Sequence, residues 1–430
     1  MISIFYPPYG FGGDAVYLHR LVDALARRDC EVDVIHCVDA FHVLSRNPQI
    51  PELSHHPNVT VHSLRSGWGL LSPLLAQQTG RPVLQGKRIQ EILQGKKFDV
   101  IHFHNISLFG PQVLALRPDY ADFIKVYTTH EHWLVCPMHV LWKYNRRLCD
   151  HPTCFACTLA FKRPPQLWRY SGLLERALDH VDLFIAPSRF TAEMHRQRGF
   201  GKPFEHLPHF VPEPPDDSFP GVPVHPRPYF LFVGRLEKIK GVQELIPAFR
   251  NYPHADLLIA GTGTQEGELR RLASGMQNVV FLGRTPLQQL PALYRNALAL
   301  VVPSIGYEVF GIIMLEAFTQ KTPVIANALG SLPEVVEESG GGLLYRNQIE
   351  LLDAMERLRT NPELRRRLGE RAYQAYRERW CEEKHVETYF RLLEEVAARK
   401  LGHIPWHSAT RASSGPAMLA NARGKLSQGP

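Results

Sequence analysis

Short apolar stretches alternate with helical patterns along the first half of the chain. The stretches are rich in β-branched and aromatic residues, which predicts strands at "ISIFY", "EVDVIHC", "FDVIHFH", "FIKVYTTH" and "DLFIAPS". Between them, apolar positions recur with helical spacing at residues 15–28 and 86–94. This alternation is typical of stacked βαβ units, so we expect a parallel sheet covered by helices.

A proline-rich segment interrupts the alternation near the middle of the chain. Residues 211–228 contain seven prolines, which disfavour regular structure there. The alternation then resumes, with strands predicted at "YFLFVGR", "ADLLIAG", "VVFLG", "ALALVVPS" and "PVIAN" and helices at residues 242–250, 267–273, 288–296 and 310–320. The pattern therefore predicts an α/β protein with two doubly wound, Rossmann-like domains that face a central cleft, where such sheets bind ligands.

The predicted organisation has five parts. They are a first domain at 1–211 with a cysteine-rich insertion at 136–157, a linker at 212–228, a second domain at 229–380, a helix at 381–400 that returns to the first domain, and a tail at 401–430. The tail is polar and patternless, which predicts disorder. A chain of 430 residues with 44% hydrophobic content has enough apolar surface for two cores.

Overall charge narrows the choice of partners only slightly. The formal net charge of +7 favours loose contact with anionic surfaces, and the basic segment 86–97 is either a solvated helix face or a membrane contact. No zinc-finger or aromatic-rich RNA-binding motif occurs, so we expect no nucleic-acid partner. No apolar stretch approaches the roughly 20 residues that span a bilayer. We expect a cytoplasmic protein, either free or in peripheral contact with the cytoplasmic face of a membrane.

Two carboxylates flank a predicted helix start in "GYEVFGIIMLEA". Glu308 follows a strand directly, and Glu316 lies about a turn and a half into the helix that begins near Phe310 or Gly311. The backbone N–H groups of Phe310, Gly311 and Ile312 have no acceptor within the helix, and such donors bind phosphate. A sugar joined to a nucleotide diphosphate has hydroxyls on both sides of a phosphate, as this arrangement requires.

Two cations follow the first strand of the second domain. Arg235 and Lys240 lie in "VGRLEKIKG", at the same carboxyl edge of the sheet as Glu308. An arginine and a lysine placed there stabilise a departing diphosphate electrostatically. The chain has no Asp-x-Asp pair, the usual metal-diphosphate motif, so protein cations and amides are expected to meet the charge. The alternative for this stretch alone is a solvated basic loop.

These stretches resemble a known family. "VGRLEKIKG", "IAGTGTQEGELRRLA", "VVFLGR" and "PSIGYEVFGIIMLEAFTQKTPVIANALGSLPEVV" are similar, in the same order, to the nucleotide-sugar half of the retaining family-4 glycosyltransferases of GT-B fold. The resemblance implies that Glu308 binds hydroxyls of the donor sugar and Glu316 the ribose, with Arg235 and Lys240 on the diphosphate. It also implies backbone contacts from Phe310, Gly311 and Ile312 and places Gly261 near the nucleotide, although a Gly-x-Gly turn also occurs in plain strand-helix connections.

The first domain shows two further similarities to this family. Gly12 and Gly13 precede an amphipathic helix, and their missing Cβ atoms let the backbone approach a phosphate or sugar, unless they are simple loop glycines. His130 ends the strand in "VYTTHEHWLVCP", where the family has a histidine beside the donor sugar. His130 is our candidate site residue, with His132 as the weaker alternative, and Glu131 replaces the commoner aspartate.

The resemblance implies a reaction without a protein nucleophile. A sugar passes from a nucleoside-diphosphate sugar (UDP, GDP or another base) to a hydroxyl of a polysaccharide, glycolipid or small glycoside precursor, with retained configuration and no catalytic metal or other cofactor. His130, Glu308, Arg235 and Lys240 would form the catalytic set. Two alternatives stay open: a nucleotide-sugar epimerase of the same fold, and a non-catalytic nucleotide-sugar-binding protein.

Four of the seven cysteines lie within 22 residues. Twelve, four and two residues separate Cys136, Cys149, Cys154 and Cys157, and this spacing with a C-x-x-C pair is typical of metal ligands in a reducing compartment. The alternatives are a structural zinc ion, an iron-sulfur cluster and unliganded thiols.

One apolar segment could meet a hydrophobic acceptor. Residues 65–80 include Trp68 and several leucines, and the pattern favours a buried helix over an exposed contact with lipid or acceptor.

Overall fold

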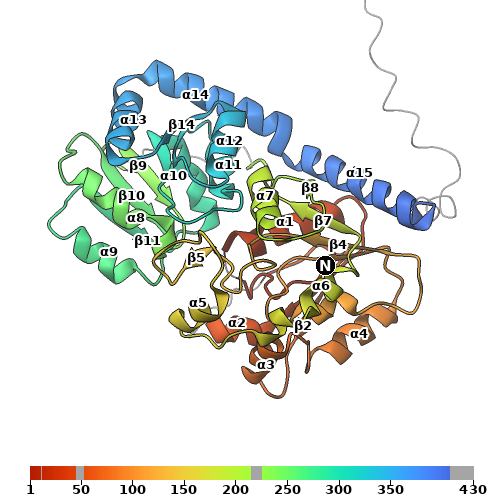
Figure 1. Cartoon of the computed structure of the whole chain (residues 1–430). Coiled ribbons are helices and arrows are strands. Elements are labelled where there is room, and N and C mark those ends of the chain that lie inside the picture. The colour runs from red at the N-terminus through yellow and green to blue at the C-terminus, as the bar shows by residue number, and fades with distance from the viewer. Residues whose placement is uncertain (11, 45–52, 215–224, 407–430) are drawn as a thin grey trace, which may run out of the picture.

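The computed structural model describes residues 1–10, 12–44, 53–214 and 225–406 and contains two α/β domains (Figure 1). The first domain has a parallel sheet of β1 Val32–Cys37, β2 Val59–Leu64, β3 Val100–Phe103, β4 Ile124–Thr128, β7 Leu183–Ala186 and β8 Glu205–His206. Ile2 forms parallel bridges to Ile35 in β1 and Phe103 in β3 and so joins the strands into one sheet. The predicted strand at residues 2–6 is therefore much shorter than expected.

Helices surround this first sheet. They are α1 Gly12–Ala26, α2 Val38–Leu44, α3 Leu71–Thr79, α4 Gly86–Gly95, α5 Cys154–Ala160, α6 Leu173–Leu178 and α7 Arg189–Gln197, with 3-10 turns at Pro111–Ala115 and Leu167–Tyr170. A small antiparallel hairpin, β5 Trp142–Lys143 and β6 Arg147–Leu148, lies in the cysteine-rich segment.

The second domain has a six-stranded parallel sheet in the order β11-β10-β9-β12-β13-β14. Its strands are β9 Tyr229–Val233, β10 Asp256–Ala260, β11 Val279–Gly283, β12 Ala299–Val302, β13 Val324–Asn327 and β14 Gly342–Tyr345. The order changes direction at β9 and β12, so ligands are expected beyond the carboxyl ends of these two strands. Both strands are buried on both faces, which explains their continuous apolar sequences.

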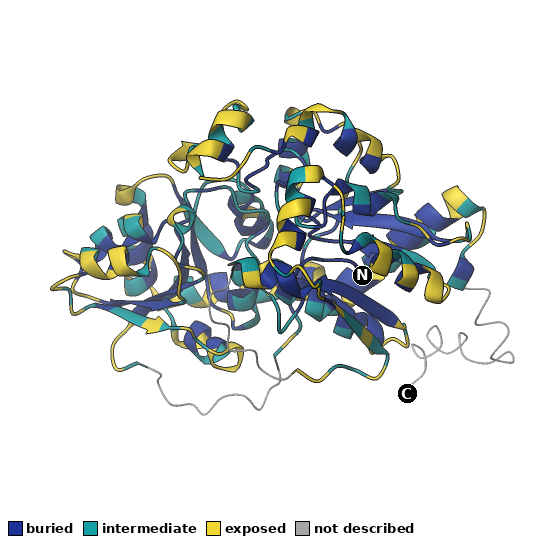
Figure 2. Cartoon of the chain, turned by 90° about the horizontal axis from the view of Figure 1, so that it is seen from below, coloured by how far each residue is buried: buried dark blue, intermediate teal, exposed yellow. Residues whose placement is uncertain are grey.

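The helices of the second domain cover both faces of its sheet. They are α8 Val242–Leu245, α9 Glu266–Leu272, α10 Leu290–Asn296, α11 Ile312–Thr319, α12 Leu332–Ser339, α13 Gln348–Thr360 and α14 Pro362–Ala375, with 3-10 turns at Lys238–Lys240, Ile246–Phe249 and Leu287–Gln289. Figure 2 shows the buried strands between helices whose outer faces are exposed. The structure confirms the predicted α/β fold with two Rossmann-like halves.

The chain crosses between the domains a second time near its end. After a π turn at Tyr376–Trp380, α15 (Glu382–Leu401) runs onto the first domain (Figure 1). Val386, Tyr389 and Leu393 pack with Leu18 and Val34 in one buried cluster. Glu382 forms ion pairs with two arginines at the end of α1.

Two predicted segments fall largely beyond the described residues. Residues 215–224 of the predicted linker and 407–430 of the predicted tail are among those that the structure does not describe. The described ends of the linker, 212–214 and 225–228, form neither helix nor strand. Within the described ranges, no helix is both long and apolar enough to cross a bilayer.

Candidate active site

Lys240 and Glu308 form a close ion pair at the carboxyl edge of the second sheet. Lys240 Nζ lies 2.7 and 2.9 Å from the two carboxylate oxygens of Glu308, and Ser304 Oγ donates to Oε1 at 2.5 Å. Burial opposes ionisation of Glu308, but Lys240, Ser304 and Arg235 outweigh it and hold the pKa of this carboxyl below its usual value. Glu308 is therefore ionised at neutral pH, with its orientation fixed by Lys240.

The loop that holds Glu308 is tied to its surroundings by the backbone. The N–H groups of Ile305 and Gly306 donate to Ile239 O, and Ser331 Oγ donates to Glu308 O at 2.9 Å. Gly241 closes the neighbouring turn with φ 75°, and a Cβ there would lie 1.8 Å from Pro303 O. The loop is therefore held before any ligand binds.

Helix α11 begins at Ile312, slightly later than the sequence predicted. Gly311 precedes it in a left-handed conformation with φ 86°, which favours glycine. The first N–H groups of the helix have no acceptor within it. Across from them lies Gly13 of the first domain, where a Cβ would lie 3.6 Å from Ile312 Cγ2. Gly13 and Ile312 thus face each other across the two domains, and the Phe310 side chain is buried.

Glu316 lies in α11 and binds two side chains that sequence reasoning missed. Arg20 of α1 donates from Nη2 to Oε1 at 2.9 Å, and Tyr294 donates from its hydroxyl to Oε2 at 3.0 Å. The Arg20 pair joins the two domains, and both side chains are mostly buried, at 16% and 15% exposed. A carboxylate offers about four lone-pair sites. Glu316 therefore keeps acceptor capacity for a ligand while Arg20 and Tyr294 fix its orientation.

Asp14 of the first domain lies within electrostatic reach of Arg235 of the second. It lies two residues after Gly12, which has φ 73°, and accepts a hydrogen bond from Asn105 at 3.2 Å. Burial raises the pKa of Asp14 to about 6 and the nearby Glu131 adds to this, whereas Asn105 and Arg235 lower it. Arg235 lowers the pKa of both Asp14 and Glu308. The exposed Arg235 guanidinium therefore acts on carboxylates from both domains.

His130 lies in the middle of a row of three histidines. Its Nε2 is 2.9 Å from His104 Nδ1, and its Nδ1 is 3.1 Å from His209 Nε2. Burial lowers the pKa of His130 to about 3, so its ring is neutral at physiological pH. His209 in turn packs edge-on against Phe310, with ring centroids 5.5 Å apart. The row thus connects the first sheet to the start of α11.

The other first-domain candidate, His132, does not join this row. Its ring is buried against His195 of α7, with centroids 5.4 Å apart. Sequence reasoning missed His104 and His209 because their partnership with His130 depends on chain segments far apart in sequence.

The local backbone structure explains why position 261 is a glycine. Its φ is 145°, and a Cβ would lie 1.9 Å from Gly234 O at the end of β9. Only glycine fits this close approach between neighbouring strand ends. The turn therefore requires this glycine, whether or not a nucleotide contacts it.

Helix α7, which the sequence pattern did not indicate, is hydrogen-bonded to the second domain. Ser188 Oγ and Thr191 Oγ1 both donate to Val309 O, at 2.6 and 3.0 Å. The backbone N–H groups of Arg189 and Phe190 donate to the Glu334 carboxylate. Ser188 also caps the helix by accepting from Thr191 N, and a serine before the helix was the sequence signal that could have found it.

The four clustered cysteines surround one small cavity of about 20 Å³. In the described ranges, no group of three or more His, Cys, Asp and Glu side chains is already placed to hold a metal ion. The structure therefore brings Cys136, Cys149, Cys154 and Cys157 together but does not arrange them as ligands.

The predicted helix in residues 65–80 is confirmed by α3, but its expected burial is wrong. Trp68 is 65% exposed, and Leu70 and Leu71 are about half exposed at the start of α3. The apolar pattern favoured burial, but among the described residues the leucines on one face of α3 stay open to solvent.

Solved structures of the same architecture place the fold in the GT-B class of glycosyltransferases. Sucrose-phosphate synthase of Thermosynechococcus elongatus aligns with a TM-score of 0.68 and 23% identity over 90% of this chain and 94% of that one. The Anabaena protein HepE in complex with UDP aligns with a TM-score of 0.62 and 16% identity over 92% of this chain and 98% of that one.

Sequence comparison identifies the family. The family model "Glycosyltransferase Family 4" matches residues 11–214, and "Glycosyl transferases group 1" matches residues 215–375. Glycogen synthase of Mycobacterium tuberculosis is 35% identical over 360 residues, which cover 78% of this chain and 79% of that protein. The chain belongs to glycosyltransferase family 4.

Other relatives match over shorter regions. An uncharacterised glycosyltransferase of Methanocaldococcus jannaschii is 39% identical over 119 residues, 26% of this chain and 30% of that protein. Alpha-D-kanosaminyltransferase of Streptomyces kanamyceticus is 33% identical over 156 residues, 34% of this chain and 40% of that protein. The aligned regions thus span well under half the length of these two relatives.

Proposed function

We propose that this protein is a retaining glycosyltransferase. It would move a sugar from a nucleoside-diphosphate sugar to a hydroxyl of a carbohydrate or lipid-linked acceptor, without a metal ion in the catalytic step. The proposal rests mainly on the Lys240–Glu308 pair, whose glutamate lies four residues before α11, the helix whose first residue, Ile312, faces Gly13 of the first domain. The Anabaena protein solved with UDP has the same fold, which supports a nucleotide-sugar donor.

The donor would be held by the second domain. The first N–H groups of α11 and the Arg235 guanidinium bind the diphosphate, while Glu308 accepts a sugar hydroxyl and Glu316 the ribose hydroxyls. The sequence predicted that Lys240 binds the diphosphate, but in the structure Lys240 is paired with Glu308. It holds Glu308 ionised and adds positive charge beside the leaving group.

The transfer step needs no protein nucleophile. The bond from the anomeric carbon to the diphosphate oxygen breaks, and a bond to the acceptor oxygen forms on the same face. The acceptor proton passes to the leaving diphosphate oxygen, whose negative charge Arg235 and the α11 amides stabilise. His130 is neutral and hydrogen-bonded through both ring nitrogens, so it would be a fixed, neutral group beside the sugar and not a proton donor.

A donor panel tests this function. The full chain is incubated with UDP- and GDP-sugars, with and without carbohydrate acceptors, and the products are identified by mass spectrometry and NMR. We expect a glycoside of retained configuration in chelator-treated buffer. Glu308→Gln should abolish it, whereas Glu337→Gln, a change at an exposed glutamate outside the site, should not.

Two outcomes would replace the proposal. A new sugar stereoisomer from donor alone would identify an epimerase. Donor binding with neither transfer nor hydrolysis would identify a non-catalytic binding protein. Calorimetry adds a second test, since Arg235→Ala should weaken donor binding strongly while Arg346→Ala, at another exposed arginine, should leave it unchanged.

We also propose that the acceptor side meets a lipid surface through α3. Trp68, Leu70 and Leu71 are exposed there, and Arg81, Lys162 and Arg163 are exposed on neighbouring segments. Aromatic and aliphatic side chains flanked by cations suit the interface of an anionic membrane. Trp68→Ser should reduce co-sedimentation with anionic vesicles, whereas Leu287→Ser, at an exposed leucine of the second domain, should not.

A further inference from the structure

The cysteine-rich segment forms a compact unit beside the proposed active site. Its four thiols line one cavity together with Met138 and Trp142. The chain turns sharply here: Tyr144 and Asn145 have φ of 53° and 56°, and Cys149 N donates to Leu141 O at 2.8 Å. These turns bring parts of the segment that are distant in sequence to the same cavity.

Few apolar side chains hold this unit together. Its buried cluster consists of Cys136, Met138, Leu141 and Met194 of α7, and partly buried side chains that include Phe161, Phe190 and Tyr307 pack against it. Phe155 and Leu159 of α5 point to solvent, at 51% and 53% exposed. Units with so small a core usually depend on a disulfide or a metal ion. The cysteines are free thiols in the structure.

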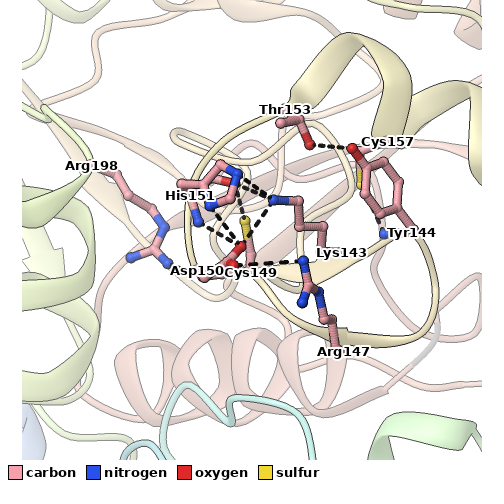
Figure 3. A network of polar contacts seen from close by, with 9 residues as sticks. All are labelled: Lys143, Tyr144, Arg147, Cys149, Asp150, His151, Thr153, Cys157 and Arg198. Atoms are coloured by element: carbon pink, nitrogen blue, oxygen red, sulfur yellow. Dashed lines mark hydrogen bonds and ion pairs between the residues drawn. The ribbon is translucent and has the colours of Figure 1, made fainter.

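Backbone N–H groups approach the sulfur atoms. Tyr144 N donates to Cys157 Sγ at 3.3 Å (Figure 3). Hydrogen bonds of this kind support metal-bound thiolates as a second shell of contacts.

Cations surround the thiols. Lys143 is buried, with its side chain 1% exposed, and its Nζ contacts Asp150 Oδ1 at 2.9 Å and His151 Nε2 at 3.0 Å (Figure 3). Arg198 donates to Cys149 O at 2.7 Å. Lys143 and Arg198 thus bring positive charge to a site whose bound form has a net negative charge, although Asp150 offsets the charge of Lys143.

We propose that Cys136, Cys149, Cys154 and Cys157 bind one zinc ion as thiolates. Each thiol loses its proton on binding, so four thiolates around one divalent ion have a formal charge of about −2. The surrounding cations offset that charge. The zinc ion would stabilise the folded form of this segment, because the segment's own apolar core is small.

The size of the cavity favours a single ion over an iron-sulfur cluster. A space of about 20 Å³ holds roughly one water-sized particle. A four-iron cluster would require the walls to move apart. A zinc ion requires only that the thiols turn into a cavity which they already line, and each cysteine has one side-chain torsion with three staggered positions.

The zinc unit would steady the segment that follows His130. Cys136 N donates to His132 O at 2.8 Å, and His132 N donates to His139 O at 2.9 Å. The Arg198 contact fixes Cys149 to the end of α7, the helix that clasps the second domain. Loss of zinc should therefore loosen the acceptor side first. This inference does not depend on the proposed transfer reaction.

Metal analysis of the purified full chain tests the proposal. Elemental analysis by mass spectrometry should find about one zinc ion per chain. The double variant Cys154→Ser/Cys157→Ser should lose it, whereas Cys30→Ser, at a half-buried cysteine outside the unit, should retain it. Zinc retained in the double variant would overturn the assignment. So would iron with acid-labile sulfide in the wild-type chain.

X-ray absorption on the wild-type protein keeps the test valid if the double variant does not fold. Zinc surrounded by four sulfur atoms at about 2.3 Å is expected, and a shell of nitrogen and oxygen would contradict the proposal. Metal-free wild-type protein that does not take up added zinc, and whose four thiols react with a thiol reagent, would also contradict it.

Discussion

The two domains share a parallel α/β architecture but contribute different groups to the proposed site. The second domain contributes fixed charges, since Lys240 holds Glu308 ionised at the end of the sheet. The first contributes a row of neutral rings, since burial keeps His130 and its neighbours uncharged, together with Arg20 and Asp14. Under the proposed function this division is expected, because a diphosphate requires charge and a sugar requires oriented neutral groups.

The two sides also differ in how they are held. Ser304 and Glu308 are four residues apart, so one loop builds much of the donor side. The histidine row takes one residue from each of three separate segments. Helix α15 contacts it indirectly, because His102 Nδ1 lies 2.8 Å from Tyr389 Oη and the His102 ring lies 4.0 Å from that of His104. The donor side is thus encoded locally, and the acceptor side depends on the assembled fold.

Lys240→Met should have the largest effect. It leaves the buried Glu308 carboxylate without its cation, and we expect turnover to fall by about 10²- to 10³-fold. Donor affinity should fall as well. Initial rates and calorimetry measure the two effects. Lys238→Met, at an exposed lysine in the same turn, is the control, and equal losses in the two variants would contradict a special role for Lys240.

His104→Leu should act on turnover alone. It removes the partner of His130 Nε2 and lets that ring move, which should lower kcat by roughly 10- to 100-fold with unchanged donor affinity. Asparagine can replace the Nδ1 atom that His104 uses, so His104→Asn should restore more activity than His104→Gln. A loss of donor affinity in His104→Leu would contradict the proposal that the second domain binds the donor while the histidine row affects turnover only.

Arg20→Ala should lower donor affinity by about tenfold, equivalent to about 1.4 kcal/mol. Arg20 orients Glu316 from the opposite domain. Without it, the Glu316 carboxylate would be less well placed to accept hydrogen bonds from the ribose hydroxyls. Arg20→Lys should retain part of the affinity. Calorimetry checks both variants against Arg88→Ala, which removes an exposed arginine of α4. Tighter donor binding in Arg20→Ala would show that Arg20 competes with the ligand instead.

Asp14→Asn should change folding stability, and the change should depend on pH. Folding raises the pKa of Asp14 from 3.8 to about 6, so the folded chain keeps a proton there that the unfolded chain releases. The free energy of unfolding therefore falls as the pH rises through this window and stays lower above it. The variant should gain up to about 3 kcal/mol at pH 8 and little at pH 4, as measured by urea unfolding. An equal gain in the free energy of unfolding at both pH values would contradict the raised pKa of Asp14.

Sequence patterns predicted the second domain well for a physical reason. Central strands such as Tyr229–Val233 are covered on both faces, so their apolar runs stand out from the helices. The donor-side motif is also contiguous in sequence. The helix start was misplaced slightly because Gly311 adopts a left-handed conformation just before α11.

The parts that sequence patterns missed depend on tertiary neighbours. Strand β8 has only two residues, and the buried positions of α7 include the polar Thr191 and His195, so a search for apolar residues marks neither element. The contact of Arg20 with Glu316 joins residues almost 300 positions apart. Trp68 was expected inside because its segment is apolar, yet burial depends on a covering element that the described fold does not supply.

The path of α15 limits how this enzyme can be recombined with its relatives. Although α15 follows the second domain in sequence, it packs on the first, where Tyr17 Oη lies 3.0 Å from His385 Nε2 and Lys400 pairs with Asp182. A chimaera cut once, in the proline-rich linker, would graft a foreign final helix onto the native acceptor lobe. A second junction near Cys381, which returns the original α15, should be needed for such hybrids to fold.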